Sequence, residues 1–218
     1  MYCPVECIVF DCDGVLLQSV DVKTRAFARL AQPFGDEARD MLLYFHARNG
    51  GVSRYEKFRW LLEEVLHCEA KPAVLNELGQ RFGALVAEEI LHCPLVEGAE
   101  AVLQRWHNVL PLYVCSGTPQ EELRGILQAR GLAPYFKAVY GTPPNKASLL
   151  RRIVAESALP PEAVLMVGDA STDRYAAQSV GTQFYGVGQE LAGGDYPWSA
   201  DLCALNAWLE QMSIEEML

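Results

Sequence analysis

The sequence predicts an α/β fold, a doubly wound parallel sheet with an inserted helical segment, and three observations support this prediction. Short apolar runs end in glycine or small polar residues, helical patterns alternate with these runs, and one long stretch carries helical patterns alone. Short runs that are apolar throughout are typical of strands buried on both faces, as in a parallel sheet. Strands that alternate with helices imply right-handed crossovers and helices on both faces of the sheet.

Four apolar runs are the predicted strands. They cover residues 5–10, 110–115, 163–167 and 182–187. Apolar residues at helical spacing predict helices at residues 119–130, 146–157, 172–180 and 201–212. Thr118, with Pro119 and Glu121 after it, has the pattern of a capping box, so we expect Thr118 to be the N-cap of the first of these helices.

The stretch from residue 17 to residue 92 interrupts this alternation. It shows no convincing strand, and helical patterns cover residues 20–31, 37–48, 54–66 and 71–92. We therefore expect two domains. Residues 1–16 and 93–218 would form the sheet domain, and residues 17–92 a helical cap inserted into it.

Composition restricts the classes of function. The 218 residues carry a net charge of -10, which argues against nucleic-acid partners and against docking on an anionic membrane surface. No apolar run approaches the roughly 20 residues that a membrane span needs. The seven cysteines lack paired spacing, which favours reduced thiols in a cytoplasmic protein over disulfides or a zinc site.

Polar side chains follow the predicted strands at the points where these strands end. Asp11 and Asp13 follow the first strand, Ser116 the second, and Asp169 and Asp173 the third. Ligands bind at the carboxyl ends of strands in open parallel sheets, so we expect these side chains to lie together. Clustered carboxylates repel one another unless they bind a cation, and Mg²⁺ is the simplest choice. The alternative is that the aspartates only shape turns and cap helices.

Two further residues suit a phosphate group beside such an ion. A hydroxyl at Ser116, with free backbone N–H groups before a helix, would form an anion site. Lys146, which opens another predicted helix, would add a positive charge. A solvated surface lysine is the alternative for Lys146.

The segments DCDGVL at residues 11–16 and GDASTD at residues 168–173, with Ser116 and Lys146 between them, resemble the four motifs of the haloacid dehalogenase-like hydrolase superfamily. The helical insertion directly after the first motif is similar to the cap of its phosphoglycolate phosphatase and β-phosphoglucomutase branch. The resemblance covers essentially the whole chain. It implies a Rossmann-like core with a helical cap and a Mg²⁺-dependent phosphatase of small phosphorylated metabolites.

The resemblance also implies the roles of the first two aspartates. Asp11 would attack phosphorus and form an aspartyl-phosphate, and Asp13 would protonate the leaving alcohol and then activate water. An acidic residue at Asp13 favours an oxygen leaving group. Cleavage of a phosphate ester is therefore expected, in preference to a carbon–halogen or carbon–phosphorus bond.

Metal and phosphate ligands follow from the same resemblance. The Asp11 carboxylate, the Asp13 backbone carbonyl and the Asp169 carboxylate would hold Mg²⁺. Asp173 would support the metal or orient the lysine of the third motif, Lys146. The phosphoryl group would be bound by that lysine, by Ser116 and by the Gly117 amide.

The cap must recognise the leaving group, and residues 48–57 are the best candidate segment of the cap for this recognition. Gly51 belongs to a Gly-Gly pair that permits a tight loop. Ser53 and Glu56 form a capping box that predicts a helix start, and Arg54 and Lys57 then share one helical face. We expect these cations to face a second polar or anionic group of the substrate, with a solvated helix face as the alternative.

Two other functions fit parts of the pattern. A sugar phosphomutase of the β-phosphoglucomutase type would transfer phosphate within a bound bisphosphate, and product analysis would distinguish it from a phosphatase. A receiver-like signalling domain also uses Asp, Ser/Thr, Lys and Mg²⁺ to hold an aspartyl-phosphate. Such a domain is smaller and carries its phosphoacceptor on a middle strand. The sequence gives no oligomeric state.

Overall fold

A parallel sheet forms the centre of the molecule in the computed structural model, which describes residues 4–214. Its six strands have the order β3-β2-β1-β4-β5-β6. Their bounds are β1 Cys7–Phe10, β2 Leu112–Pro119, β3 Ala138–Thr142, β4 Val164–Gly168, β5 Gln183–Val187 and β6 Trp198–Ser199. Strand β1 lies between β2 and β4, where Phe10 pairs with Val114 on one side and Val167 on the other.

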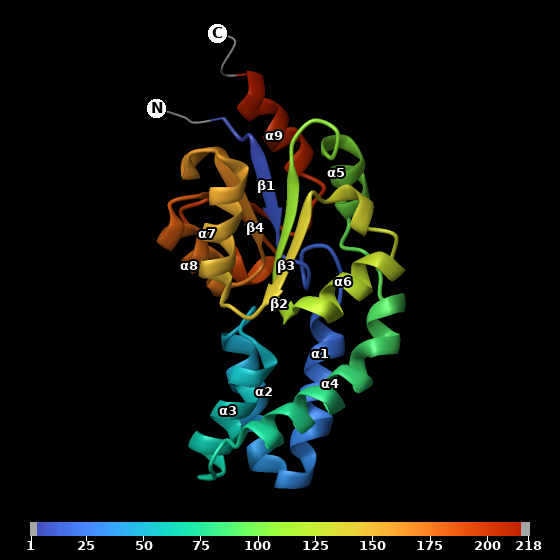
Figure 1. The fold of residues 1–218 in the computed structure, drawn as a ribbon. Helices are drawn as coiled ribbons and strands as arrows, with labels where there is room; N and C mark the ends of the chain where they lie inside the picture. The colour runs from blue at the N-terminus through green and yellow to red at the C-terminus, as the bar shows by residue number, and fades with distance from the viewer. Residues whose placement is uncertain (1–3, 215–218) are drawn as a thin grey trace.

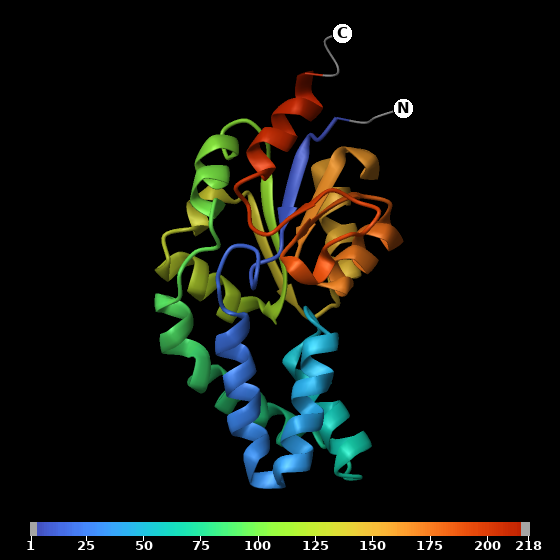
Figure 2. The same ribbon diagram turned by 180° about the vertical axis from the view of Figure 1, so that it is seen from behind.

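Side chains of the central strand alternate between two hydrophobic cores because successive residues of a strand point to opposite faces. Ile8 and Phe10 pack in one core, Cys7 and Val9 in the other, and all four are fully buried. The first core is covered by helices α5 (Ala99–Trp106), α6 (Gln120–Ala129) and α9 (Leu205–Ile214), and the second by α7 (Lys146–Ser157) and α8 (Ser171–Val180). Figures 1 and 2 show these two helical layers flanking the sheet. The predicted doubly wound α/β fold is confirmed.

Four helices lie beyond the carboxyl ends of the strands, and we call them the cap (Figure 1). They are α1 (Val20–Ala31), α2 (Asp36–Arg48), α3 (Arg54–Trp60) and α4 (Pro72–His92). Phe27, Phe58 and Phe82 bring α1, α3 and α4 together, with ring centroids 4.5 to 6.1 Å apart. The helix predicted over residues 54–66 is α-helical only to Trp60 and continues as a π-helix at Leu61–Val65.

Among the α-helices and strands that the structure describes, three were not predicted from the sequence: α5, β3 and β6. Strand β3 is an edge strand whose first two residues, Ala138 and Val139, are only half-buried, so it lacks the continuous apolar run of the central strands. Strand β6 has two residues, and α5 has eight. Such short elements leave little periodicity for a sequence pattern to reveal.

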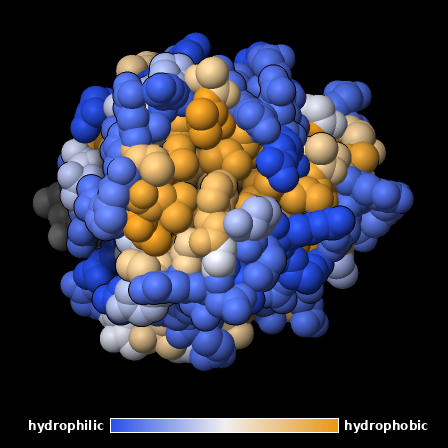
Figure 3. All heavy atoms as spheres, turned by 90° about the horizontal axis from the view of Figure 1, so that it is seen from below, coloured by the Kyte–Doolittle hydropathy of each residue, from blue (hydrophilic) through white to orange (hydrophobic). Residues whose placement is uncertain are grey.

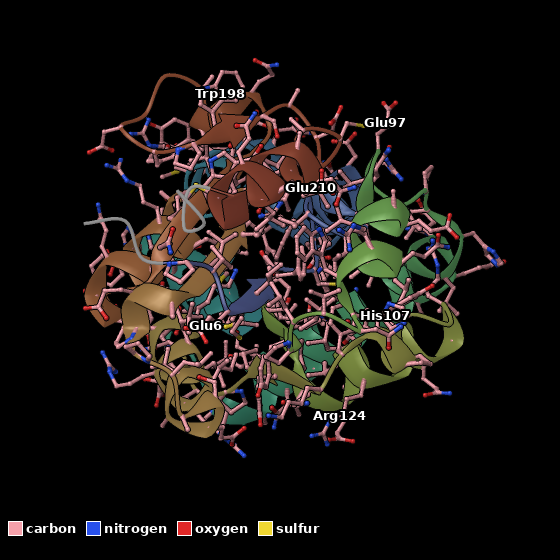
Figure 4. All side chains as sticks on the ribbon, turned by 90° about the horizontal axis from the view of Figure 1, so that it is seen from above. Glu6, Glu97, His107, Arg124, Trp198 and Glu210 are labelled. Carbon is pink, nitrogen blue, oxygen red and sulfur yellow. The ribbon has the colours of Figure 1, made fainter. Side chains whose placement is uncertain are left out.

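The two ends of the molecule differ in their surfaces. Figure 3 shows an apolar area on the end formed by the cap, and exposed apolar residues of the cap include Phe34 and Tyr44. In a view from the opposite end, Glu97, His107 and Arg124 lie at the periphery (Figure 4). Among the helices within residues 4–214, none combines the length and the apolar character that a bilayer crossing requires.

Candidate active site

The carboxyl ends of β1 and β4 position the first acidic residues. Asp11 directly follows β1, and its backbone N–H donates to the Val167 carbonyl at 2.9 Å, which fixes it beside β4. Asp169 directly follows β4. The chain builds β2 and β3 on one side of β1 and then returns to build β4 to β6 on the other. Open α/β sheets bind ligands at this kind of switch point.

Three carboxylates meet at this edge of the sheet. Asp11, Asp169 and Asp173 each offer an oxygen, and these oxygens lie within 4.8 Å of one another. Burial, and then the charges of Asp11 and Asp173, raise the pKa of Asp169 well above its usual range. This crowding is the electrostatic situation that a bound cation relieves.

Lys146 lies between two of these carboxylates. Its Nζ is 2.8 Å from Oδ2 of Asp11 and 2.5 Å from Oδ1 of Asp173. Burial alone would lower the pKa of Lys146, but the charges of Asp11 and Asp173 outweigh it and raise the pKa well above its usual range. The lysine opens α7, where the side chain of Asn145 caps the helix by accepting from the Ser148 N–H at 3.0 Å.

Asp173 contacts Lys146 with one carboxylate oxygen and the protein backbone with the other. Its Oδ2 accepts from the Ala170 N–H at 3.1 Å, while its Oδ1 accepts from Lys146. Asp169 differs, because among the described residues its carboxylate has no hydrogen-bond or ion-pair partner and it lines the cavity. This donor set, oxygen atoms at a sheet edge with one carboxylate left open, fits a hard divalent cation such as Mg²⁺.

The expected phosphate-binding segment has a different local structure from the predicted one. Strand β2 extends through Thr118 to Pro119, α6 begins at Gln120, and Thr118 does not cap the helix, so the predicted capping box is wrong. The register of β2 against β3 shifts between Ser116 and Pro119, as at a β-bulge. The buried Ser116 accepts from the Thr118 N–H at 3.2 Å, and Gly117 faces the cavity.

Asp13 is surrounded by donors from two segments, the start of α1 and the end of β2. Its Oδ2 accepts from Lys23 Nζ at 2.5 Å and from Thr118 Oγ1 at 3.0 Å, and its Oδ1 accepts from Ser19 Oγ at 2.5 Å. Burial alone would raise the pKa of Asp13, but the charge of Lys23 and these hydrogen bonds outweigh it and lower the pKa to about 2. Asp13 is therefore held ionised.

Sequence reasoning missed Lys23 and His46 as residues of the site. Both had a detectable signal, because each stands four residues from a buried apolar side chain of the same helix. Lys23 precedes Phe27 in α1, and His46 follows Leu42 in α2. Residues four apart share a helix face, so a polar residue there points toward the packed side of the helix.

A cavity of about 260 Å³ extends from the aspartates to the cap. Of the predicted site residues, its walls contain Asp11, Asp13, Gly51, Arg54, Lys57, Gly117 and Asp169. Ser116, Lys146 and Asp173 are buried behind the wall. The cavity thus combines the core residues with the candidate residues of the cap in one space, of a size suited to a small ligand.

The cap loop at Gly50 and Gly51 touches the core directly. Thr172 Oγ1 donates to the Gly50 carbonyl at 2.5 Å. Gly51 has φ of +73°, and a Cβ there would lie 2.3 Å from Thr172 Oγ1. A Cβ on Gly117 would lie 2.2 Å from the Gly51 carbonyl oxygen. Only glycines allow this approach of cap and core, and the cap is closed over the cavity.

The helix that carries the two cap cations begins where the sequence indicates. Ser53 is the N-cap of α3, and its side chain accepts from the Tyr55 N–H at 3.2 Å. Arg54 and Lys57 both line the cavity, so neither lies on a solvated helix face.

Comparisons with known proteins agree with this architecture. Residues 5–181 match the family model described as haloacid dehalogenase-like hydrolase. A phosphoglycolate phosphatase of Synechococcus elongatus is 28% identical over 189 residues, 81% of each chain. A phosphorylated carbohydrates phosphatase of Thermotoga maritima is 27% identical over 213 residues, 92% of this chain and 94% of the relative.

Solved structures share the fold at lower sequence identity. The crystal structure of a β-phosphoglucomutase from Clostridium difficile superposes with a TM-score of 0.79 at 16% identity, covering 98% of this chain and 99% of that one. At this identity the similarity concerns the fold alone.

The chain belongs to the haloacid dehalogenase-like hydrolase family, because the family model covers most of its length. The predicted family resemblance is confirmed, as is the prediction of an enzyme, a phosphatase of this family. The receiver-like alternative does not agree with a match that runs from β1 through the cap to α8.

Proposed function

We propose that this enzyme hydrolyses phosphomonoesters of small metabolites with the help of Mg²⁺, through an aspartyl-phosphate at Asp11. The observation that carries the proposal is the position of the Asp11 carboxylate. It faces the cavity beneath the cap, 2.8 Å from Lys146 and beside the open carboxylate of Asp169. Burial raises the pKa of Asp11, but the ammonium of Lys146 opposes that shift and favours the ionised nucleophile.

In the first step, a carboxylate oxygen of Asp11 bonds to phosphorus while the bond between phosphorus and the alcohol oxygen breaks. The leaving oxygen takes a proton from Asp13. In the second step, Asp13 takes a proton from water as the water oxygen bonds to phosphorus, and phosphate leaves Asp11. The second step needs Asp13 in its ionised form, and the positive charge of Lys23 favours that form. The first step needs a proton on Asp13, and the proton that Asp13 takes from water in the second step of one turnover supplies it for the next.

Asp11, Asp169 and the backbone carbonyl of Asp13 would hold Mg²⁺, and Asp173 would act by orienting Lys146, which it contacts at 2.5 Å. When bound, the ion would offset the negative charge of the carboxylates and of the phosphoryl oxygens.

Three core residues would bind the transferred phosphoryl group: Ser116, the Gly117 amide and Lys146. Lys146 supports this assignment because its ammonium already stabilises two carboxylates and supplies the positive charge closest to Asp11. A preorganised cation stabilises charge that develops in the transition state.

The substrate class is supported by two relatives, one named as a phosphoglycolate phosphatase and the other as a phosphorylated carbohydrates phosphatase. We place Gly51, Arg54 and Lys57 around the leaving group, because all three line the cavity. Residues 1–16 and 93–218 would act as the catalytic core and residues 17–92 as the cap. The cysteine pattern favours a cytoplasmic location.

A hydrolysis screen with Mg²⁺ against a panel of phosphorylated metabolites tests the proposal. Release of inorganic phosphate by the wild-type protein, lost in Asp11→Asn, is the expected result. An isomerised ester with no phosphate release would instead identify a phosphomutase. Absence of any turnover across the panel would contradict the proposed function.

A further inference from the structure

Three cations line the cavity in the part of the chain that the structure describes, and two of them are neutralised. Lys23 is paired with Asp13 at 2.5 Å. Arg54 is paired with Glu122 at 2.5 Å, and its guanidinium lies over the Phe82 ring at 4.5 Å. A cation with a carboxylate partner at this distance offers little net charge to a ligand.

Lys57 is the third cation, and within residues 4–214 its ammonium has no carboxylate at salt-bridge distance. The residue is only 2% exposed. Its Nζ lies 2.7 Å from Nδ1 of His46 and 5.4 Å from the centre of the Phe27 ring. A buried cation without a directly paired carboxylate is costly. Burial, followed by the charge of Lys23, lowers the pKa of Lys57 to about 7, although the more distant charges of Asp13 and Asp169 act in the opposite direction.

The hydrogen bonds around His46 determine how it holds Lys57. Thr24 Oγ1 donates its one proton to the Val20 carbonyl at 2.9 Å. Its oxygen can therefore only accept from Nε2 of His46, 3.2 Å away. That bond places the ring proton on Nε2 and leaves a lone pair on Nδ1, which accepts from Lys57. Burial and then Lys57 lower the pKa of His46 to about 3, so the ring is neutral and supplies no counter-charge.

We propose that Lys57, aimed into the cavity by the chain of hydrogen bonds through His46 and Thr24, binds a second anionic group of the phosphomonoester. A carboxylate or a second phosphate on the leaving group supplies the charge that the ammonium lacks. Arg54 does not bind this group, since Glu122 of α6 already neutralises it. The Arg54–Glu122 pair joins α3 of the cap to the core and holds the cap closed.

This inference rests on the proposed phosphatase function and deepens it. It assigns different roles to Arg54 and Lys57, two cations that look equivalent in the sequence. Lys57 determines specificity, His46 and Thr24 are positioning residues, and Arg54 contributes to closure. Loss of Lys57 or of its positioning residues should change the preference between esters, whereas loss of Arg54 should lower the turnover of every ester alike.

Three esters of one chain length test the role of Lys57. They are the phosphate ester of 3-hydroxypropanoate, 1,3-propanediol bisphosphate and propyl phosphate, whose leaving groups carry a carboxylate, a phosphate and no charge. We expect wild type to prefer a charged ester to propyl phosphate, and the better of the two identifies the anionic group. In Lys57→Met, the ratio of kcat/KM for that ester over propyl phosphate should fall about tenfold or more, mainly through KM. An unchanged ratio in Lys57→Met would overturn the inference.

Variants of His46 separate positioning from simple support of the fold. His46→Leu removes the acceptor for Lys57 and should lower the same ratio severalfold. His46→Asn places an amide oxygen near the position of Nδ1 and should restore most of it. A merely structural role would lower kcat/KM for all three esters alike, with no rescue by Asn, and that outcome would contradict the positioning role.

Arg54 supplies the matched comparison, because it is the other cap cation in the same cavity. Arg54→Met should lower kcat/KM for all three esters by a similar factor and keep the ratio, and Glu122→Gln should do the same. If the preference for the charged ester over propyl phosphate were lost in Arg54→Met but kept in Lys57→Met, Arg54 and not Lys57 would bind the anionic group.

Calorimetric binding of the three esters, without turnover, tests Lys57 independently of catalysis. If wild type hydrolyses none of them with Mg²⁺ but binds the charged ester more weakly after Lys57→Met, the proposed function fails and the binding inference stands. If hydrolysis occurs and the charged and neutral esters bind alike in both proteins, the inference fails and the phosphatase assignment stands.

Discussion

The ammonium of Lys23 in the cap lies 2.5 Å from Oδ2 of Asp13 in the core. The closed cap therefore supplies the counter-charge of Asp13, the residue that would transfer the proton. Thr118 adds a contact from a third segment, because its hydroxyl donates to the same carboxylate oxygen as Lys23 does. Closure and the protonation state of Asp13 are coupled through this one carboxylate.

Replacing Lys23 should change the pH dependence of turnover. The pKa of Asp13 is lowered to about 2, so Asp13 stays ionised until the pH falls through that value. In Lys23→Met, burial would dominate and raise this pKa, so the acidic limb of the kcat profile should shift to higher pH. Lys23→Arg keeps the charge and should leave the limb near its wild-type position. Identical acidic limbs in wild type and Lys23→Met would show that Lys23 does not control Asp13.

The same pair predicts a change in acid stability. A lowered pKa contributes stability that is present above the unfolded-state pKa of about 3.9 and is lost as the pH falls toward about 2. Lys23→Met removes this contribution, so acid unfolding followed by circular dichroism should begin at a higher pH than in wild type. An unfolding midpoint that does not rise would contradict the ion pair.

Removal of the Asp11 carboxylate should stop turnover. Asp11→Asn keeps the size of the side chain but loses the nucleophilic oxygen, so we expect phosphate release to fall by at least about 10³-fold. Thermal unfolding provides the control, since a folded variant with a cooperative transition excludes a general structural failure. Steady hydrolysis at a tenth of the wild-type rate would rule out Asp11 as the nucleophile.

Chelation tests the proposed metal site. EDTA should abolish activity, and Mg²⁺ should restore it and raise the melting temperature, because a ligand at 100 times its Kd stabilises the folded state by about 2.7 kcal/mol. Asp169→Asn removes the open carboxylate of the cluster and should weaken both effects of Mg²⁺. Full activity in excess chelator would refute the metal requirement.

The approach of the cap loop to the core predicts a strong effect of a single methyl group. Gly51→Ala would place a Cβ 2.3 Å from Thr172 and 2.9 Å from Lys146 Nζ, so we expect the cap to be displaced and kcat/KM to fall about a hundredfold. Gly131→Ala is a matched control, since Gly131 has a similar φ of +68° and nothing within 4 Å of the added Cβ. Equal losses in the two variants would indicate backbone strain, not a blocked closure.

Local and periodic features of the fold could be predicted from the sequence. The buried strand before Asp11 is a continuous apolar run, and Ser53 caps α3 through a bond to Tyr55, two residues away. The convergence of Asp11 and Asp169 could also be expected, because the carboxyl ends of parallel strands share one edge. Each of these features depends on a few consecutive residues or on the topology alone.

Local patterns failed where a tertiary contact competed with them. The residues from Thr118 to Glu121 carry a capping pattern, yet β2 continues through Thr118 and its hydroxyl donates to Asp13, 105 residues earlier in the chain. Side-chain capping contributes about 1 kcal/mol, which strand pairing and a charged hydrogen bond can exceed.

The sequence by itself determined the end of the first strand, the helical cap and the set of acidic residues that meet at one edge of the sheet. Only the tertiary structure decided which cations are neutralised, since Arg54 meets Glu122 across 68 residues while Lys57, three residues further on, is hydrogen-bonded to the uncharged ring of His46. The physical reason is the separation along the chain over which each kind of interaction acts. Hydrophobic periodicity and caps act over one or two helical turns, whereas the pairing of buried charges depends on which segments the packed chain brings within a few ångströms.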